Sequence, residues 1–532
     1  MNTQGNQKRK GIDLFAALYL ATAGFLFLSG AAPFIHGPLA ALVEQKPWIH
    51  RMSLSFMALS ALALFAFQDY RHQCSKVFCR NLPAFSSRRW TWIIFFALSM
   101  LWSASAILRH EVFHSGFDMA IFTQAVCNTV YGNFLYSSIK GGISLLGDHF
   151  SPLLGILALP YALWPNPQCL LVLQAVAAAA CVFPIRALAL EKLKNETWAI
   201  LFIVAFAFYL PAVNAVRFDF HPEILVMPLQ LWAFYFLIRN RLWWASFFIA
   251  LCFLAKENAA LAAAGLGLYT IAGRSKRFFG LFWVFFSVIF LWFVTHSVVP
   301  FFSGEPYAYL SGNFITWRDL GMGALLKHVV GKDSVFYLFK IFAPLGFLAF
   351  LSPQALLLVL PALVQNLAAR NEMVLSIFHH YTAFLTPYVF AASICGAAKL
   401  PARRLSFYYL AAAVLWMAGV SEWYILQTYW NKWTPHLQRV HQDLKRVPAG
   451  APVRTHEFFA AHLACRKELY IYENHHPREG GSAKAENAVY VVLDRMFLGD
   501  TAEQDFRNLG ARGYETVFED DGFRIFKKGN RS

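Results

Sequence analysis

Charged side chains are scarce in this sequence of 532 residues. Asp, Glu, Lys and Arg together make up 14% of the chain, whereas 58% of it is hydrophobic and 17% is aromatic. In an ordinary soluble domain about a quarter of the residues are charged. The deficit excludes a water-soluble globular protein, because so much apolar surface requires a lipid bilayer as its solvent.

Cysteine motifs are missing as well. The eight cysteines include no CxxC pair and no metal-binding spacing. Most of them lie in apolar runs, and Cys465 is the sole cysteine of the polar C-terminal region, so we expect no intramolecular disulfide there. A phosphate-binding loop, an internal repeat and a signal-peptide cleavage site are also lacking. The first apolar run follows Lys8-Arg9-Lys10 and is typical of a signal anchor.

Acidic residues are outnumbered by basic ones, 30 to 46, and the formal net charge is +16. A surplus of this kind often indicates nucleic-acid binding. Here the basic residues cluster in short loops between apolar runs, as they do in the cytosolic loops of membrane proteins. We therefore expect the lipid bilayer, and no nucleic acid, as a partner.

The apolar runs predict a multi-pass α-helical membrane bundle. Several runs are shorter than the roughly 20 residues of a straight span, so we expect about 13 transmembrane helices, within a range of about 11 to 14. The runs cover residues 13–35, 52–69, 90–107, 168–188, 197–213, 223–238, 242–255, 257–273, 278–299, 335–351, 354–367, 378–397 and 405–425.

The loop charges predict the orientation of the chain. With a cytosolic N-terminus, the cytosolic loops hold 18 basic residues in about 55 positions, and the outer loops hold about 10 in roughly 114. This asymmetry places the C-terminal tail outside the inner (cytoplasmic, or plasma) membrane. The apolar segment 151–164 would invert that order if it crossed the bilayer, so we interpret it as an interfacial or re-entrant helix.

The tail, residues 427–532, has the composition of a soluble domain. Short apolar stretches alternate with polar ones, which predicts a small extracytoplasmic α/β domain. We expect strands at 468–473, 488–494, 514–518 and 523–527, and a helix near 501–509.

Polar residues gather at the predicted outer ends of the membrane helices, where burial makes them costly. Each group also has a simpler explanation, such as a solvated loop charge, a local ion pair or an interfacial anchor, while Asp219, His221 and Glu223 could together hold a metal. The loop 108–150 contributes Arg109, His110, Glu111, His114, Asp118, Gln124, Asp148 and His149, and later stretches contribute Asp219, His221, Glu223, Lys256, Glu257, His379 and His380.

Four of these stretches carry a resemblance. Residues 117–124 (FDMAIFTQ), 147–152 (GDHFSP), 219–223 (DFHPE) and Lys256-Glu257 resemble, in order and spacing, the membrane family called domain of unknown function 2079, DUF2079. Met119-Ala120 replaces the Leu-Gly expected there. The resemblance begins near residue 90, which implies that residues 1–89 are additional transmembrane helices and that residues 90–426 are the family's membrane core.

That family is similar to the C-type (GT-C) glycosyltransferases, which use polyprenyl-phosphate sugars. The similarity implies a GT-C-like fold and an acidic catalytic residue in the first large outer loop. Asp118 fits that place best, and Asp148 is a second acidic candidate. A carboxylate can take the proton from the acceptor, and positive charge or a metal can stabilise the leaving phosphate.

The polar residues at the outer helix ends supply a set of candidate substrate-binding residues, and a divalent metal is a candidate cofactor. The donor would be a polyprenyl-phosphate-linked sugar, while the sequence leaves the acceptor open. The predicted substrate-binding residues are His149, Gln124, Asp219, His221, Glu223, Lys256, Glu257, His379, His380 and Arg109.

Two other functions are compatible with the sequence. A transporter or lipid flippase normally places its polar residues near the bilayer midplane, often within repeats, whereas these lie at helix ends and no repeat is found. A non-catalytic relative that binds a lipid-linked sugar would keep the same residues without the reaction.

Overall fold

The computed structural model describes residues 87–307, 328–400, 429–472 and 485–529, together with residues 309 and 323. The runs predicted at 13–35, 52–69 and 405–425 lie outside the described residues. So does nearly all of the segment 1–89, and its additional helices therefore stay a prediction.

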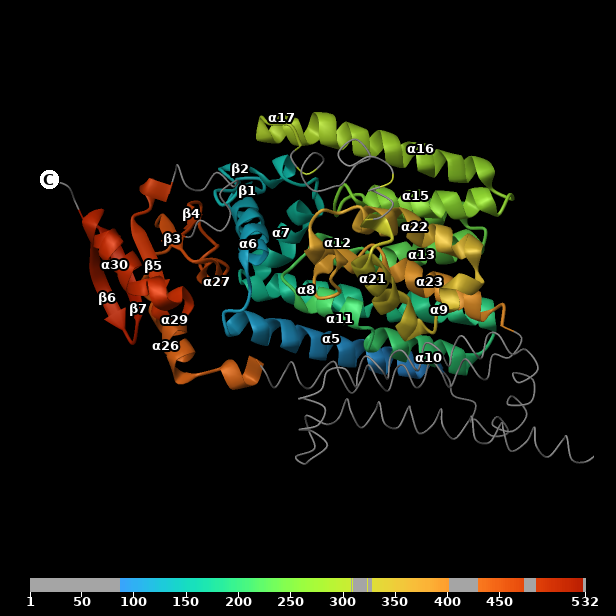
Figure 1. Ribbon diagram of the computed structural model, residues 1–532, viewed down its shortest axis with the longest axis horizontal. Coiled ribbons are helices and arrows are strands. Elements are labelled where there is room, and N and C mark those ends of the chain that lie inside the picture. The colour runs from blue at the N-terminus through green and yellow to red at the C-terminus, as the bar shows by residue number, and fades with distance from the viewer. Residues whose placement is uncertain are drawn as a thin grey trace, which may run out of the picture.

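The membrane core is a bundle of helices that lie roughly side by side, with the tail at one end (Figure 1). Most of the predicted runs coincide with helices. The run 335–351 breaks into a helix and two 3₁₀ turns, and the run 378–397 becomes regular α-helix only from Thr386. The helices are α5 (Ser87–Glu111), α8 (Pro167–Ala179), α9 (Val182–Leu193), α10 (Glu196–Ala207), α11 (Leu210–Arg217), α12 (Pro222–Leu225), α13 (Met227–Ile238), α14 (Leu242–Cys252), α15 (Ala259–Ala272), α16 (Arg277–Phe293), α17 (Val299–Ser303), α21 (Lys332–Phe342), α22 (Pro353–Leu367) and α23 (Thr386–Ala397), with a π-helical segment η3 (Val294–Val298) and 3₁₀ turns η4 (Ala343–Leu345), η5 (Leu348–Leu351), η6 (Glu372–Leu375) and η7 (His380–Thr382).

Local sequence signals set several helix boundaries. Asn166 accepts a hydrogen bond from the backbone N–H of Gln168, and Pro167 occupies the first position of α8, so both N-terminal preferences are met. Asn195 caps α10 in the same way through Trp198. Lys194, in the left-handed conformation with a φ of 52°, separates α9 from α10.

Close helix packing depends on glycine. A Cβ at Gly265 would collide with the backbone carbonyl of Leu358, and a Cβ at Gly396 would collide with that of Leu348. Small residues of this kind let membrane helices approach to backbone contact. The sequence therefore fixes the contacts of α15 with α22 and of α23 with η5.

Three helical segments of the described chain are long and apolar enough to cross a bilayer: Ser87–Glu111, Pro167–Leu193 and Arg277–Ser303. The pair α10 and α11 passes the same test together, with a bend of 45° between them. Large apolar side chains of α16, including Phe278, remain exposed on the bundle surface, as expected for a face in lipid. The total of about 13 spans and the orientation of the termini stay predictions.

The loop 108–150 is ordered around a helix. It contains α6 (Phe117–Val130), a two-stranded ribbon of β1 (Tyr136–Ser137) and β2 (Ile143–Ser144), and the 3₁₀ turn η2 (Leu145–Gly147). The apolar segment predicted to be a non-spanning helix forms α7 (Leu153–Leu163), one of the shorter apolar helices. Both α6 and α7 lie at the end of the bundle that faces the tail (Figure 1).

The tail contains a five-stranded mixed sheet in the order β4-β3-β5-β7-β6. β3 runs parallel to β4 and β5, whereas β7 is antiparallel to β5 and β6. All four predicted strands and the predicted helix are present, and the short β3 was missed. The elements are α26 (Pro435–Asp443), η8 (Leu444–Arg446), β3 (Val453–Thr455), α27 (Glu457–Ala460), β4 (Leu469–Ile471), η9 (Ala485–Asn487), β5 (Tyr490–Asp494), α29 (Arg495–Leu498), η10 (Gly499–Thr501), α30 (Ala502–Ala511), β6 (Tyr514–Asp520) and β7 (Phe523–Lys528).

The sheet shares its hydrophobic core with the loop 108–150. Buried residues of α6, such as Met119, belong to the same apolar cluster as Val453 of β3 and Leu469 of β4. Ser138 also bonds to both backbone groups of Leu469, at 2.8 Å each. The tail is therefore packed onto the loop 108–150, and its folding as an independent unit stays a prediction.

The expectation that Cys465 makes no intramolecular disulfide was wrong. Cys465 is bonded to Cys127 of α6, 338 residues earlier in the chain. The prediction considered only cysteines within the tail. The apolar contact between the sheet and α6 brings a partner from a distant segment, which no sequence spacing indicates.

Candidate functional site

Asp118 occupies the first turn of α6, and its side chain is 41% exposed. Carboxylate Oδ2 lies 3.5 Å from Nε2 of His221, whose own side chain is only 3% exposed. His221 is held in place from behind, since its Nδ1 lies 2.9 Å from the carbonyl of Asp219 and its backbone N–H donates to Gln174. The site thus presents one accessible carboxylate against a fixed, buried imidazole.

Asp219 positions the start of α6. Its Oδ2 accepts hydrogen bonds from the backbone N–H groups of Gly116 and Met119, at 2.9 and 3.3 Å. Its Oδ1 lies 2.6 Å from a guanidinium nitrogen of Arg109. A carboxylate at a helix N-terminus complements the orphan N–H groups and the helix dipole. The predicted pair Arg109 and Asp219 therefore fixes the turn that carries Asp118.

Behind Asp118 the site continues into the bundle. The rings of His221 and His380 are stacked with centroids 3.5 Å apart. His380 Nε2 lies 3.6 Å from Oε1 of Glu223, and Lys256 Nζ lies 3.2 Å from the same oxygen. Glu223 is only 3% exposed. Lys256 supplies the positive charge that compensates this buried carboxylate. Four segments far apart in sequence meet in this chain of contacts.

The surroundings of Asp118 favour its charged form. Burial opposes ionisation, but His221, Lys140 and Lys256 together hold the pKa of Asp118 below its usual value. Burial likewise works against a charged His221, yet the Asp118 carboxylate raises the pKa of this imidazole above its usual value. Asp118 is therefore an ionised carboxylate near neutral pH, the state that a general base requires.

A second carboxylate–histidine pair lies beside the first. Oε1 of Glu257 is 2.8 Å from Nδ1 of His149 and accepts a hydrogen bond of 2.7 Å from the Tyr307 hydroxyl. Oε2 accepts the backbone N–H of Phe150 at 2.9 Å. Both oxygens of Glu257 are thus occupied by donors from the protein.

Asp148 also lies in an ion pair. Its Oδ1 is 3.2 Å from Lys140 Nζ and accepts a hydrogen bond of 3.0 Å from the Tyr309 hydroxyl. Tyr309 in turn stacks on His149, with centroids 4.6 Å apart. Asp148 therefore belongs to the same group of contacts as His149 and Glu257. Its ion-pair partner Lys140 also acts electrostatically on Asp118.

Two predicted residues have different surroundings. Gln124 is buried under the tail, where its amide nitrogen bonds to Ser138 and to the carbonyl oxygen of Arg466, and its oxygen accepts from Ser137. This amide connects α6 to the tail. His379 packs against Phe218 in a T-shaped arrangement, with ring centroids 5.1 Å apart.

Sequence reasoning missed three residues of the site. Lys140, Tyr307 and Tyr309 supply the cation and the hydroxyl groups that contact Asp148 and Glu257. No periodic pattern marks them, and a lysine followed by two glycines, Gly141 and Gly142, is a weak signal by itself.

The set Asp219, His221 and Glu223 does not converge on one point. Asp219 faces Arg109, Glu223 faces Lys256, and His221 faces Asp118. Because each carboxylate already has its own cation, these three residues have no common position for a metal ion. The residues fit an anionic ligand better, since the two lysines near Asp118 carry positive charge.

Comparison with known proteins identifies the family. The family described as predicted membrane protein, DUF2079, matches residues 109–524. The chain belongs to the DUF2079 family. This confirms the resemblance carried by the four motifs, and comparison with curated protein sequences gave no match.

Solved structures show the fold of this DUF2079 protein. ArnT from Cupriavidus metallidurans bound to undecaprenyl phosphate is similar with a TM-score of 0.55 and 11% identity, over 84% of this chain and 99% of ArnT. The apo state of the same enzyme gives a TM-score of 0.53 and 12% identity, over 83% and 98% of the two chains. ArnT is a C-type glycosyltransferase, so the DUF2079 chain has a GT-C-like membrane fold.

Proposed function

We propose that this protein is a membrane glycosyltransferase that uses a polyprenyl-phosphate-linked sugar, with its active site on the extracytoplasmic face. One observation carries the proposal: an accessible carboxylate, Asp118, lies against a buried group made of His221, His380 and Lys256, in a fold shared with ArnT. The ArnT structure is bound to undecaprenyl phosphate, a polyprenyl phosphate.

In the proposed reaction, Asp118 acts as the base. The ionised carboxylate takes the proton from the acceptor hydroxyl as its oxygen attacks the anomeric carbon of the sugar. The bond from that carbon to the phosphate oxygen breaks, and the lipid phosphate leaves with the electron pair. His221 orients the carboxylate through their 3.5 Å contact.

The leaving phosphate requires positive charge. The charges of Lys140 and Lys256 both lower the pKa of Asp118, and these ammonium groups are the ones proposed to stabilise the anion. Asp148, which accepts a hydrogen bond from Tyr309, pairs with Lys140, and Glu223 pairs with Lys256 within the bundle. These contacts fix where the two ammonium groups lie before a donor arrives.

The test measures binding and transfer separately. Purified protein in detergent is first titrated with undecaprenyl phosphate, and membranes are then assayed for transfer of labelled sugar from polyprenyl-phosphate donors. We expect binding in the wild type and in Asp118→Asn, with transfer only in the wild type. Asp333→Asn, an exposed acid in the first turn of α21, is the matched control and should keep both.

Binding without transfer in the wild type, across the donors tested, would support the non-catalytic lipid-binding function instead. Full transfer by Asp118→Asn would remove the base role from this residue and pass it to Asp148. The absence of lipid-phosphate binding would contradict the substrate class itself.

A further inference from the structure

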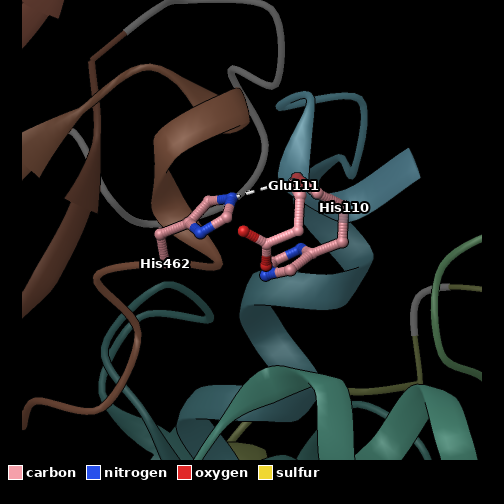
Figure 2. Close-up of side chains that lie close together, drawn as sticks. All are labelled: His110, Glu111 and His462. Carbon is pink, nitrogen blue, oxygen red and sulfur yellow. Dashed lines mark hydrogen bonds between the residues drawn. The ribbon is translucent and has the colours of Figure 1, made fainter. Parts of the chain in front are cut away.

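A separate group of metal-binding side chains lies where the membrane core meets the tail. His110 and Glu111 end the long helix α5, and His462 follows α27 in the tail. One potential ligand atom from each residue lies within 4.8 Å of the other two. Figure 2 shows His462 facing His110 and Glu111 across this junction.

The two histidines are held by contacts that leave one ring nitrogen of each available. Nε2 of His462 lies 3.1 Å from the carbonyl oxygen of His110. Nδ1 of His110 lies 3.1 Å from the Ser115 hydroxyl. Histidines that bind metals usually use their second ring nitrogen for a hydrogen bond of this kind, which fixes the tautomer and the ring orientation.

The carboxylate of Glu111 has partners that are not cations of fixed charge. One oxygen accepts a hydrogen bond of 2.7 Å from the Gln168 amide, and the other lies 3.5 Å from Nε2 of His441. Among the residues that the structure describes, no lysine or arginine forms an ion pair with Glu111. This differs from Glu223 and Asp219, whose charges are compensated by Lys256 and Arg109.

The junction is also poorly hydrated. His110 is 1% exposed, and its ring is stacked on that of His462 with centroids 3.9 Å apart. Phe113 covers the pair, with its ring 4.5 Å from that of His462. The Glu111 side chain is 26% exposed, so its carboxylate keeps contact with solvent on one side while a positive ion could reach it and the two imidazoles from the other.

We propose that His110, Glu111 and His462 bind one divalent transition-metal ion, of the zinc class, that joins α5 to the tail. The ligands would be Nε2 of His110, a Glu111 oxygen and Nδ1 of His462, with water in the fourth position. Two histidines and one carboxylate form a known three-residue zinc set. Zinc–nitrogen bonds of about 2.0–2.1 Å bring ligand atoms to within about 4 Å of one another, so binding would draw the three residues closer and turn the two imidazole rings out of their stacked arrangement.

The proposed ion would fix the position of the loop 108–150. His110 directly follows Arg109, the residue that holds Asp219 and through it the first turn of α6. His441 would orient Glu111, since its Nε2 also lies 2.7 Å from the Glu111 carbonyl oxygen. The metal and the disulfide would thus hold the tail to two different helices, α5 and α6.

The experiment uses the full chain, purified in detergent with an affinity tag that contains no histidine. We expect elemental analysis to find about one zinc per chain, and zinc added after chelation to raise the melting temperature by on the order of a few degrees, because a ligand stabilises the state that binds it. Cobalt substituted for zinc should give the visible absorption of a low-coordinate site.

Three variants test whether Glu111 and His462 bind the zinc. Glu111→Gln and His462→Asn should lose the bound zinc, the cobalt spectrum and the thermal response. His114→Ala, which changes a nearby histidine that contacts Lys432 and not the cluster, should keep all three. If a variant fails to fold, the wild-type stoichiometry and cobalt spectrum still decide. Zinc far below one per chain, together with an equal thermal response in wild type and Glu111→Gln, would overturn the proposal.

Discussion

Two Asp–His pairs in this molecule differ in what surrounds them. Asp118 and His221 are 3.5 Å apart in the membrane core, and the aspartate side chain is 41% exposed. Asp494 and His436 are 2.8 Å apart in the tail, and the aspartate is 1% exposed. Burial raises the pKa of Asp494 despite hydrogen bonds from Met496 and His436, whereas the cations near Asp118 hold its pKa below the usual value.

The comparison shows that the residue pair alone does not determine a role. Asp494 begins α29, where its Oδ1 accepts the backbone N–H of Met496 at 2.7 Å. Its oxygens are engaged by the protein, so the pair closes the end of β5. Asp118 keeps an accessible face and two lysines nearby, as a site for an anionic substrate requires.

The largest difference is expected in transfer activity. Asp118→Asn should lower the transfer rate by about 10²–10⁴, because a positioned base is lost while the side-chain shape is kept. Asp494→Asn makes the same chemical change in the other pair and should leave the rate nearly unchanged. The assay is transfer of labelled sugar in membranes, and equal losses in both variants would contradict the distinction.

The next largest effect concerns the buried ion pair behind Asp118. Lys256→Met should destabilise the core by about 3–5 kcal/mol, since Glu223 would be left as a buried charge without its cation. The double variant Glu223→Gln with Lys256→Met should recover most of that loss. Thermal unfolding of Lys256→Met, Glu223→Gln and the double variant in detergent measures the coupling, and strictly additive losses would show that the two side chains do not compensate each other.

His456 in the tail extends the comparison of the two Asp–His pairs, because it is a buried histidine that forms no ion pair with a carboxylate among the described residues. His456 is 4% exposed and lies beside Phe459. Among the described residues, neither of its ring nitrogens has a hydrogen-bond partner. Burial lowers the pKa of His456 to about 3. Because the unfolded chain binds the proton more tightly, stability should fall as the pH drops below about 6.5, by about 1.4 kcal/mol per unit until the pH nears the folded-state pKa.

His456→Leu removes this titration and should flatten the pH dependence of unfolding between pH 6 and 4, with little effect at pH 7. Melting curves of the full chain at several pH values provide the measurement. An unchanged slope in the variant would assign the acid sensitivity to other groups.

The smallest effects are expected at Asp494 itself. Asn can replace the carboxylate as the N-terminal cap of α29, so Asp494→Asn should change stability by less than about 1 kcal/mol. Asp494→Ala removes the cap and should cost about 0.5–2 kcal/mol. Chemical unfolding followed by tail fluorescence separates the two, and equal losses would show that the cap contributes little.

The sequence predicted most of the helices and the polar groups of the site, for a physical reason. Apolar runs restrict where polar residues can lie, so Asp118, His221, Glu223 and Lys256 had to be near helix ends. Their convergence follows once the helices bundle. The four strands of the tail were visible because apolar and polar residues alternate in them.

The remaining contacts depend on tertiary packing. Lys140 reaches Asp148 from a turn between β1 and β2, and no periodic pattern marks it. Gln124 was predicted to bind substrate, but its amide connects α6 to the tail, which depends on how the sheet docks. The three-residue strand β3 is too short to show an alternation.

The bond between Cys127 and Cys465 has a consequence for how the protein is made. The two cysteines are separated by 338 residues, so one leaves the ribosome long before the other exists. Cys127 must remain unpaired while the remaining membrane helices are synthesised and inserted, and the bond needs an oxidising compartment to form. A shift in mobility between reduced and unreduced samples would therefore mark chains whose tail has docked onto α6.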